Sequence, residues 1–177
     1  MVTQDQLTTD EIRFVALHEA AHAVVAAHLG MPVSEIGIGL EHGLGGYAQP
    51  SAISVRQFRA MGDGAFRKRT EQEMQLESSY RYLCVCFAGP FIAKENGRLG
   101  SNRDSKEIEA TVQRLGLTDA DAGCLLKKAM MRAAGILIRR HRAVLRLAAA
   151  IEALGTKGVL SGEQVARILG TRRRGQK

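Results

Sequence analysis

The sequence predicts an α+β fold that is mostly helical, with a short β-hairpin or edge strand near the N-terminal end and a helical C-terminal part. Apolar residues recur at helical spacing in several long segments, whereas alternation typical of a strand occurs in one short segment. The 177 residues are 45% hydrophobic, enough for one domain to bury a core without disulfides. We therefore expect a single domain over residues 1–170, followed by a basic, disordered tail over residues 171–177.

The first helix is the clearest element. Thr8-Thr9-Asp10-Glu11 fits a capping box, in which Thr8 and Glu11 satisfy each other's backbone N–H groups. Apolar residues then follow at helical spacing until Gly30-Met31-Pro32, where the helix should end.

A strand pattern follows the first helix. Ile36, Ile38 and Leu40 alternate with glycine or polar residues, which predicts a strand. A glycine-rich turn and a return strand over residues 47–49 would complete a hairpin. Residues 51–69 are polar and basic and fit either a loop or a loosely ordered pair of helices.

The rest of the chain is predicted to be helical. One helix covers about Thr70 to Lys94, with a break or kink at Gly89-Pro90, and another begins near Asp104. A long helix over 119–154 is stopped by Gly155, and Ser161 caps a short terminal helix.

Composition narrows the classes of function. The net charge of +7 would suit a nucleic-acid partner, but the basic residues are spread over several segments with few aromatics between them, so nucleic-acid binding is not favoured. Arg172-Arg173-Arg174 fits a solvated tail. No stretch approaches the roughly 18 apolar residues that a membrane span needs, and no signal peptide is evident. We therefore expect a cytoplasmic protein whose three cysteines are reduced and buried.

The first helix carries the motif H-E-x-x-H in the segment from His18 to His22. Residues four apart share one face of a helix, so both imidazoles can bind one Zn²⁺ ion. Glu19 lies beside them as the general base on a zinc-bound water, which is the chemistry of peptide-bond hydrolysis. Two histidines do not complete a catalytic zinc site, so a third ligand must come from elsewhere.

Several residues are candidates for the third ligand. His28 has the spacing of an H-E-x-x-H-x-x-G-x-x-H motif, but Val25 stands where that motif has glycine, and a continuous helix turns His28 about 120° away from His22. Asp104 follows a glycine-containing loop at a predicted helix start, where a metal ligand and a plain N-cap are equally open. The less favoured candidates belong to the predicted strand or its turn: Glu35, Glu41 and His42.

The segment His18 to Ala23 reads H-E-A-A-H-A and resembles H-E-A-G-H-A, the active-site helix of the FtsH-type AAA metalloproteases. The segment Gly100 to Asp104, G-S-N-R-D, is similar to that family's G-A-S-N-D. The resemblance covers almost the whole chain, with departures that include Ala21 for a glycine, Pro90 for an arginine and an inserted Arg103. Further similar segments are Gly45-Gly46-Tyr47, Ala88-Gly89-Pro90 through Lys94-Glu95, Ile138 to Leu154, and Leu160 to Val165.

This resemblance implies a zinc site in which His18, His22 and Asp104 are the Zn²⁺ ligands. The expected activity is that of a zinc metalloendopeptidase acting on flexible or unfolded polypeptides, paired with an edge strand near Ile36 to Leu40. No G-x-x-x-x-G-K-[ST] loop is present, so a partner ATPase or unfoldase would be a separate chain. The family also implies a homo-oligomeric ring. The alternative function is a catalytically inactive, peptidase-like binding or regulatory module.

Overall fold

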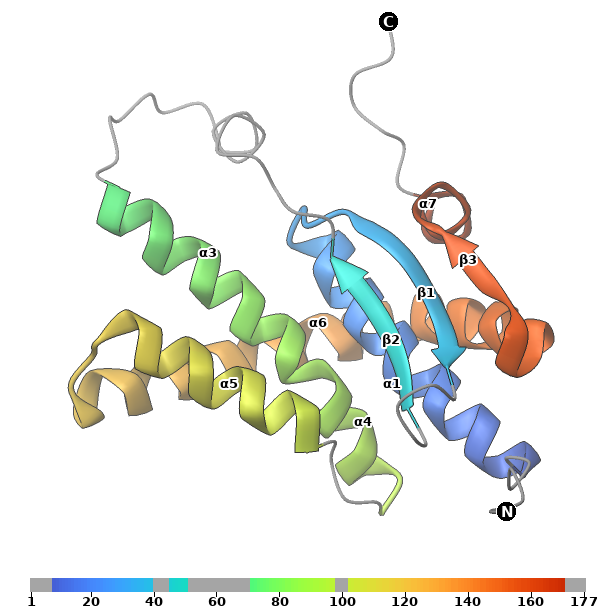
Figure 1. Ribbon diagram of the computed structural model, residues 1–177, viewed down its shortest axis with the longest axis horizontal. Coiled ribbons are helices and arrows are strands. Elements are labelled where there is room, and N and C mark those ends of the chain that lie inside the picture. Colours follow the sequence, from blue (N-terminus) through green and yellow to red (C-terminus); the bar gives the residue numbers. More distant parts are fainter. Residues whose placement is uncertain (1–7, 40–44, 51–70, 98–101, 171–177) are drawn as a thin grey trace, which may run out of the picture.

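The computed structural model describes residues 8–39, 45–50, 71–97 and 102–170, and it shows the predicted α+β, mostly helical fold (Figure 1). The strands form one small sheet, and the helices surround a central helix, α1. In chain order the elements are α1 (Thr9–His28), β1 (Val33–Gly39), β2 (Gly45–Pro50), α3 (Glu71–Cys86), α4 (Ala88–Glu95), α5 (Asn102–Leu115), α6 (Asp119–Leu154), the 3₁₀ turn η1 (Gly155–Lys157), β3 (Val159–Ser161) and α7 (Gly162–Leu169).

Helix α1 begins as the sequence predicts. The Thr8 side chain accepts a hydrogen bond from the Glu11 backbone N–H, and the Glu11 carboxylate accepts one from the Thr8 backbone N–H at 2.8 Å. Eleven residues of α1 between Val15 and Ala26 are buried. They are covered because α6 and α4 pack against this helix and the β1–β2 hairpin covers another side of it. The helix that carries the metal-binding motif is therefore the core element of the fold.

The sheet has the strand order β2-β1-β3, with antiparallel pairing throughout. The predicted hairpin is confirmed, since Ile36 on β1 lies opposite Ala48 on β2. The expectation that the strand near Ile36 to Leu40 is a free edge is wrong, because β3 pairs with Glu35 to Gly37 on its other side. A strand as short as β3 leaves no alternation to detect, and Leu40 lies outside the described residues. Among the described strands, the edge on the hairpin side of the sheet is β2 instead.

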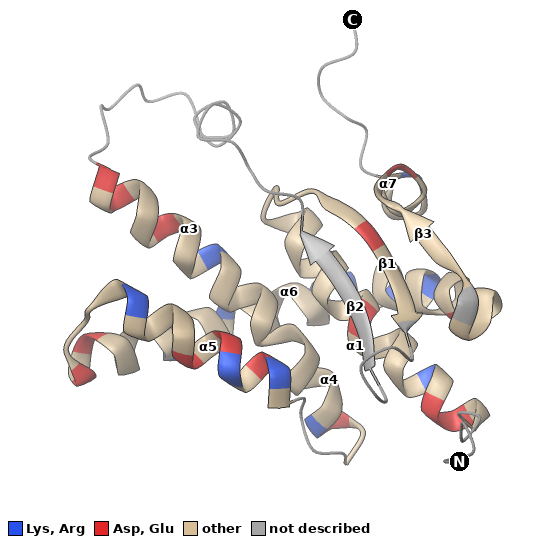
Figure 2. Ribbon diagram, in the orientation of Figure 1, with Lys and Arg blue, Asp and Glu red and all other residues tan. Residues whose placement is uncertain are grey.

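The predicted helix over residues 70–94 is two helices, α3 and α4, separated at Phe87. The break lies just before Gly89-Pro90 because a proline in the first turn of α4 has no N–H to pair and no preceding turn to clash with. Acidic Glu71 and Glu73 stand at the start of α3, where they suit the positive end of the helix dipole (Figure 2).

The C-terminal elements return the chain to the sheet. Gly155 ends α6 with a positive φ of 63°, as its position in the sequence predicts. Ser161 and Gln164 form a capping box at the start of α7. Gly162 lies so close to β1 that a Cβ atom built on it would stand 2.0 Å from the Val33 carbonyl oxygen, which fixes α7 tightly against the sheet.

Among the helices described here, none combines the length and the apolar character that a membrane crossing requires. The predictions for residues 51–69 and for the basic tail at 171–177 lie outside the described residues.

Candidate metal centre

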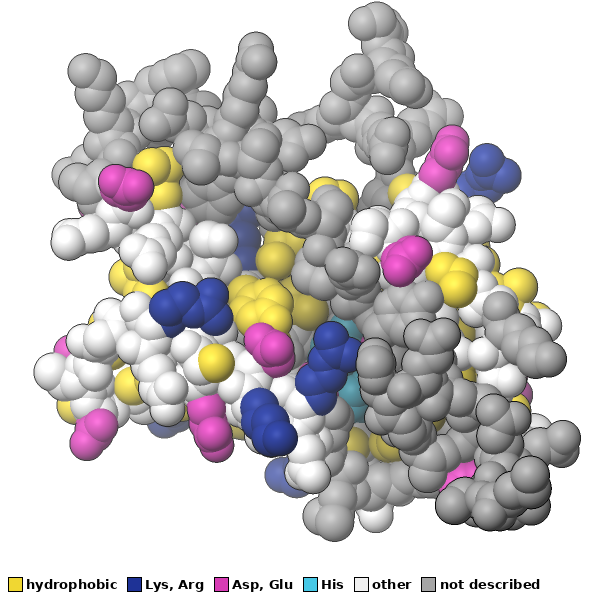
Figure 3. All heavy atoms as spheres, in the orientation of Figure 1, with side chains coloured by type: hydrophobic (Ala, Val, Ile, Leu, Met, Phe, Trp, Pro, Cys, Tyr) yellow, Lys and Arg dark blue, Asp and Glu magenta, His cyan; other side chains and the backbone are white. Residues whose placement is uncertain are grey.

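The two histidines of the motif meet on the buried side of α1. Their side chains are four residues apart, and the Nε2 atoms of His18 and His22 lie 3.1 Å from each other. Each residue is less than one tenth exposed. Histidine surface, cyan in Figure 3, is visible near the middle of the face drawn there.

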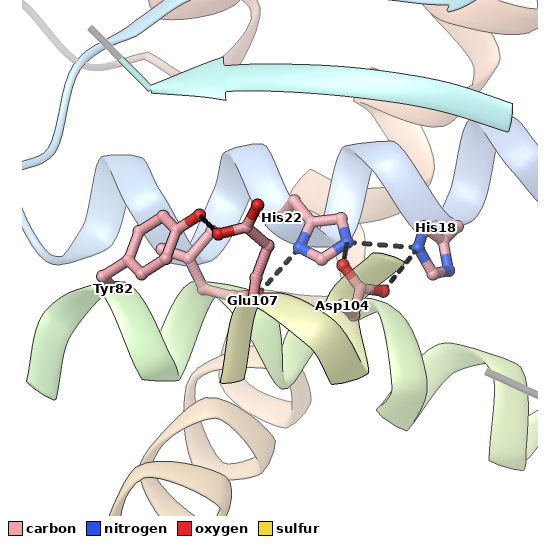
Figure 4. A network of polar contacts seen from close by, with 6 residues as sticks. His18, His22, Tyr82, Asp104 and Glu107 are labelled. Carbon is pink, nitrogen blue, oxygen red and sulfur yellow. Dashed lines mark hydrogen bonds and ion pairs between the residues drawn. The ribbon is translucent and has the colours of Figure 1, made fainter. Parts of the chain in front are cut away.

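The backbone of α3 orients one of these rings. His22 Nδ1 lies 2.8 Å from the Val85 carbonyl oxygen, which can only accept a hydrogen bond, so Nδ1 carries the proton and donates it. In the neutral ring the Nε2 lone pair is then free and directed toward His18 (Figure 4). A hydrogen bond from the other ring nitrogen to a carbonyl is the usual arrangement around a histidine that binds a metal ion.

Asp104 brings a carboxylate to the same point from α5. Its Oδ2 lies 3.1 Å from His18 Nε2, and its Oδ1 lies 3.4 Å from His22 Nε2. The residue is buried, and among the described residues Oδ2 has no hydrogen-bond donor of suitable geometry. Asp104 stands inside the first turn of α5 with its carboxylate directed at the imidazoles, rather than capping its own helix (Figure 4).

These distances fit a metal ion. In a tetrahedral zinc site with bonds of about 2.0–2.1 Å, neighbouring ligand atoms stand about 3.3 Å apart. His18 Nε2 and His22 Nε2 are 3.1 Å apart, which is near that value, and the Asp104 carboxylate presents Oδ2 to His18 at 3.1 Å and Oδ1 to His22 at 3.4 Å. With one ligand atom taken from each residue, the three atoms lie within 4.8 Å of one another. Two imidazole nitrogens and one carboxylate oxygen are also a donor set that suits zinc, and three protein ligands leave a fourth position open.

The electrostatics of the cluster favour a positive charge between the three residues. Burial acts to raise the pKa of Asp104, but its contacts with His18 and His22 outweigh burial and hold that pKa at about 2. Burial acts to lower the pKa of His22, whereas Asp104, Glu19 and the Val85 carbonyl raise it overall. A proton or a cation can supply the required charge, so protons and metal ions compete for this site.

A second contact holds α5 in place. The Tyr82 hydroxyl on α3 donates a hydrogen bond of 2.9 Å to Glu107 Oε2, one helical turn after Asp104 (Figure 4). Burial, together with neighbouring Cys86 and Glu107, raises the pKa of Tyr82, so this hydroxyl keeps its proton. Helix α3 thus contacts both sides of the cluster: Val85 holds the ring of His22, and Tyr82 holds the helix that carries Asp104.

Glu19 is buried beside the cluster, with an exposed fraction of 5%. Burial raises the pKa of its carboxyl and outweighs His22 and His18, which lower it. The charge of Asp104 raises this pKa further. Glu19 directly follows His18 on α1, so a carboxyl group of the type that serves as a general base stands next to a candidate ligand in the sequence.

The other candidate ligands do not join this group. His28 is exposed at the C-terminal end of α1, and Glu35 lies on β1, so neither belongs to the His18, His22 and Asp104 cluster. Glu41 and His42 lie outside the described residues.

Gly89 is a residue of the site that the sequence pattern did not reveal. A Cβ atom built on it would stand 2.4 Å from His18 Nε2 and 2.5 Å from His22 Nε2. The available signal was a glycine followed by proline within a run of larger apolar residues, which we interpreted only as a helix break.

Residues 12–94 match the sequence profile of peptidase family M50, just under half of the chain. The matched part contains His18, Glu19, His22 and Gly89, and it ends before Asp104. No curated protein matches the chain. The profile match supports a metallopeptidase domain, and it does not extend to the more specific resemblance to the FtsH-type proteases.

Proposed function

We propose that the protein is a zinc-dependent endopeptidase that hydrolyses flexible or unfolded polypeptides, with His18, His22 and Asp104 as the metal ligands. The main support is the convergence of two imidazole nitrogens from α1 and a carboxylate from α5, whose ligand atoms lie within 4.8 Å of one another, as one bound ion requires. The match of residues 12–94 to a metallopeptidase profile supports the same reaction class.

In this proposal Glu19 is the general base. Bound zinc supplies a Lewis acid that polarises the scissile carbonyl and makes water more acidic. The Glu19 carboxylate accepts a proton from the attacking water and delivers it to the leaving amine. Burial keeps water and counter-ions away from this carboxylate, so its interactions with the reacting groups are strong.

The substrate would bind as an extended chain along β2. In the part of the chain that the structure describes, the sheet ends at β2 on this side, and β2 runs alongside α1 above the histidines (Figure 4). An exposed strand edge offers unpaired backbone groups that a peptide can satisfy by adding a strand. A folded substrate could not add a strand in this way, so the proposal favours unfolded segments.

The FtsH-like subtype belongs to the same proposal. It is supported by the H-E-A-A-H-A helix and by the position of Asp104 in the G-S-N-R-D segment, which follows that family's pattern. In the same reading, any unfolding of substrates by ATP hydrolysis would be the work of a separate ATPase, and the protein could act as a homo-oligomer.

The test combines metal analysis with hydrolysis of an unfolded polypeptide such as reduced, carboxymethylated lactalbumin. Wild-type protein should carry about one zinc per chain and cleave the substrate. Glu19→Gln should keep its zinc and lose turnover by roughly 10²–10⁴-fold, because the base is removed while the ligands remain. Glu109→Gln, the same change at an exposed position on α5, is the matched control and should keep both properties.

The possible outcomes separate the two functions under consideration. Wild-type protein that binds zinc without cleaving any unfolded polypeptide would favour the catalytically inactive binding module. Wild-type protein that binds no zinc would refute the metal site and the peptidase activity together.

A further inference from the structure

Gly89 lies against the two imidazoles that define the candidate metal centre. It is a buried residue in the first turn of α4, and α4 packs against α1. A Cβ atom at this position would stand 2.3 Å from His18 Cε1, 2.4 Å from His18 Nε2 and 2.5 Å from His22 Nε2. These separations are far shorter than an ordinary contact between non-bonded carbon and nitrogen atoms.

The backbone conformation does not explain the glycine. Gly89 does not have a positive φ. It lies within helix α4, where alanine is more favourable than glycine by about 1 kcal/mol. What excludes a side chain at this position is the pair of imidazoles. Glycine is required here by the contents of the site.

We infer that Gly89 is a positioning residue for the metal, because only a residue without a side chain lets both Nε2 atoms turn toward a common ion. This inference rests on the proposed zinc site. The atoms that a methyl group would meet are the ends of two side chains, not backbone. Gly89→Ala should therefore move the imidazoles and disrupt the metal site while α1 and α4 keep their places.

The matched control is Gly123→Ala on α6. Gly123 is exposed within a helix, and a Cβ atom there meets nothing within 4 Å. The two variants make the same chemical change in a helix, but the new methyl group meets the histidines only in Gly89→Ala.

The experiment measures zinc per chain and zinc affinity, together with circular dichroism and thermal unfolding in a chelator. Wild type and Gly123→Ala should bind about one zinc per chain. Gly89→Ala should show the same helical spectrum and a zinc affinity lower by more than about 100-fold. Wild-type zinc affinity in folded Gly89→Ala would overturn the inference.

A second variant covers the case in which Gly89→Ala fails to fold. Combining His18→Ala and His22→Ala with Gly89→Ala removes all three of the nearest atoms that the methyl group would meet. If this triple variant folds where the single variant does not, the imidazoles are the obstacle and the inference stands. If the triple variant does not fold although His18→Ala combined with His22→Ala does, the requirement for glycine lies elsewhere and the inference is wrong.

A readout without metal separates this inference from the proposed function. In zinc-free wild type, the His22 Nδ1–H that donates to Val85 should give a protected imidazole NH signal in NMR spectra. Zinc-free Gly89→Ala should lose that signal, because the ring has moved. This result would support the role of Gly89 in orienting the rings even if wild type bound no zinc, whereas an unchanged signal would overturn it.

Discussion

Asp104 differs from the histidines in how it reaches the site. His18 and His22 are placed by one helical turn of α1, whereas Asp104 comes from α5 and lies 3.1 Å from the nearest imidazole nitrogen. Its buried Oδ2 makes no hydrogen bond of suitable geometry to a described residue, so positive charge within the His18, His22 and Asp104 cluster has to balance the carboxylate. A bound cation therefore interacts more strongly with this buried carboxylate than it would with an exposed one.

The corresponding prediction concerns Asp104→Asn. The amide keeps the shape of the carboxylate but removes its charge, so zinc affinity should fall by more than about 10-fold. Competition with a chromophoric chelator measures this affinity. Glu109→Gln changes an exposed carboxylate on the same helix and should leave it unaltered. Equal affinity in Asp104→Asn and wild type would exclude Asp104 as a ligand.

The three cysteines are predicted to react at different rates. Burial raises the pKa of Cys84 to about 11 and that of Cys86 to about 12, so both remain protonated thiols at pH 8 and are unreactive. Cys124 on α6 is exposed, contrary to the expectation that all three are buried. Titration with a disulfide reagent should show one fast thiol per chain, and the other two only after unfolding. Three fast thiols would contradict the packing of α3.

At the scale of single residues, the sequence predicted those site residues that lie close together along one helix. His18, Glu19 and His22 follow from a motif within one helix, and the structure brings the two imidazoles together as that spacing requires. The meeting with Asp104 depends on how α5 docks, which no local pattern encodes. The position of Asp104 at a predicted helix start left a ligand and an N-cap equally open, and the family resemblance decided between them. Gly89 was missed because its partners lie on another helix.

At the scale of whole elements, Gly162 at the start of α7 is needed because this helix packs closely against strand β1. Here a Cβ atom would meet the Val33 carbonyl oxygen at 2.0 Å, and this backbone atom belongs to β1. β1 is held on both sides by β2 and β3, so it cannot move away without breaking the sheet. The close approach therefore couples the C-terminal helix to the hairpin.

Gly162→Ala should accordingly lower the free energy of unfolding, by about 1–3 kcal/mol as for other overpacked sites. Gly123→Ala should leave it unchanged or raise it by up to about 1 kcal/mol, since alanine favours a helix. Chemical denaturation of both variants in a chelator measures the difference. Equal stabilities would mean that α7 can shift away from β1 at no cost.

The elements with strong local signals were the ones that the sequence predicted well. The capping boxes at Thr8 and Ser161 and the stop at Gly155 marked helix ends correctly. The order of strands could not be predicted, because β3 is three residues long and joins β1 from the other end of the chain. The same limit explains why β1 was expected at the edge of the sheet.

Over the whole molecule, a metal ion would join parts of the chain that are distant in sequence. His18 and His22 lie on the central helix, whereas Asp104 lies on α5, which packs mainly on α3. An ion that binds only the folded state stabilises it by mass action, by about 2.7 kcal/mol at 100 times its dissociation constant. The stability of the molecule should therefore depend on metal.

Thermal unfolding with and without zinc tests this dependence. Zinc should raise the midpoint of wild type and of Glu19→Gln, whose ligands are intact. It should have much less effect on Asp104→Asn, which lacks the charged ligand on α5. A midpoint that does not respond to zinc in wild type would contradict binding across the two helices.

The hydrogen bond between Tyr82 and Glu107 has a consequence for the lifetime of the bound ion. When α5 separates from α3, Asp104 is carried away from the histidines and this hydrogen bond is broken in the same movement. Such local opening occurs repeatedly in the native state, and its frequency falls as the contacts that must break become stronger. Exchange of the metal with solution would then be timed by the opening of α5, so that one tyrosine hydroxyl outside the ligand set helps to determine how long the ion stays bound.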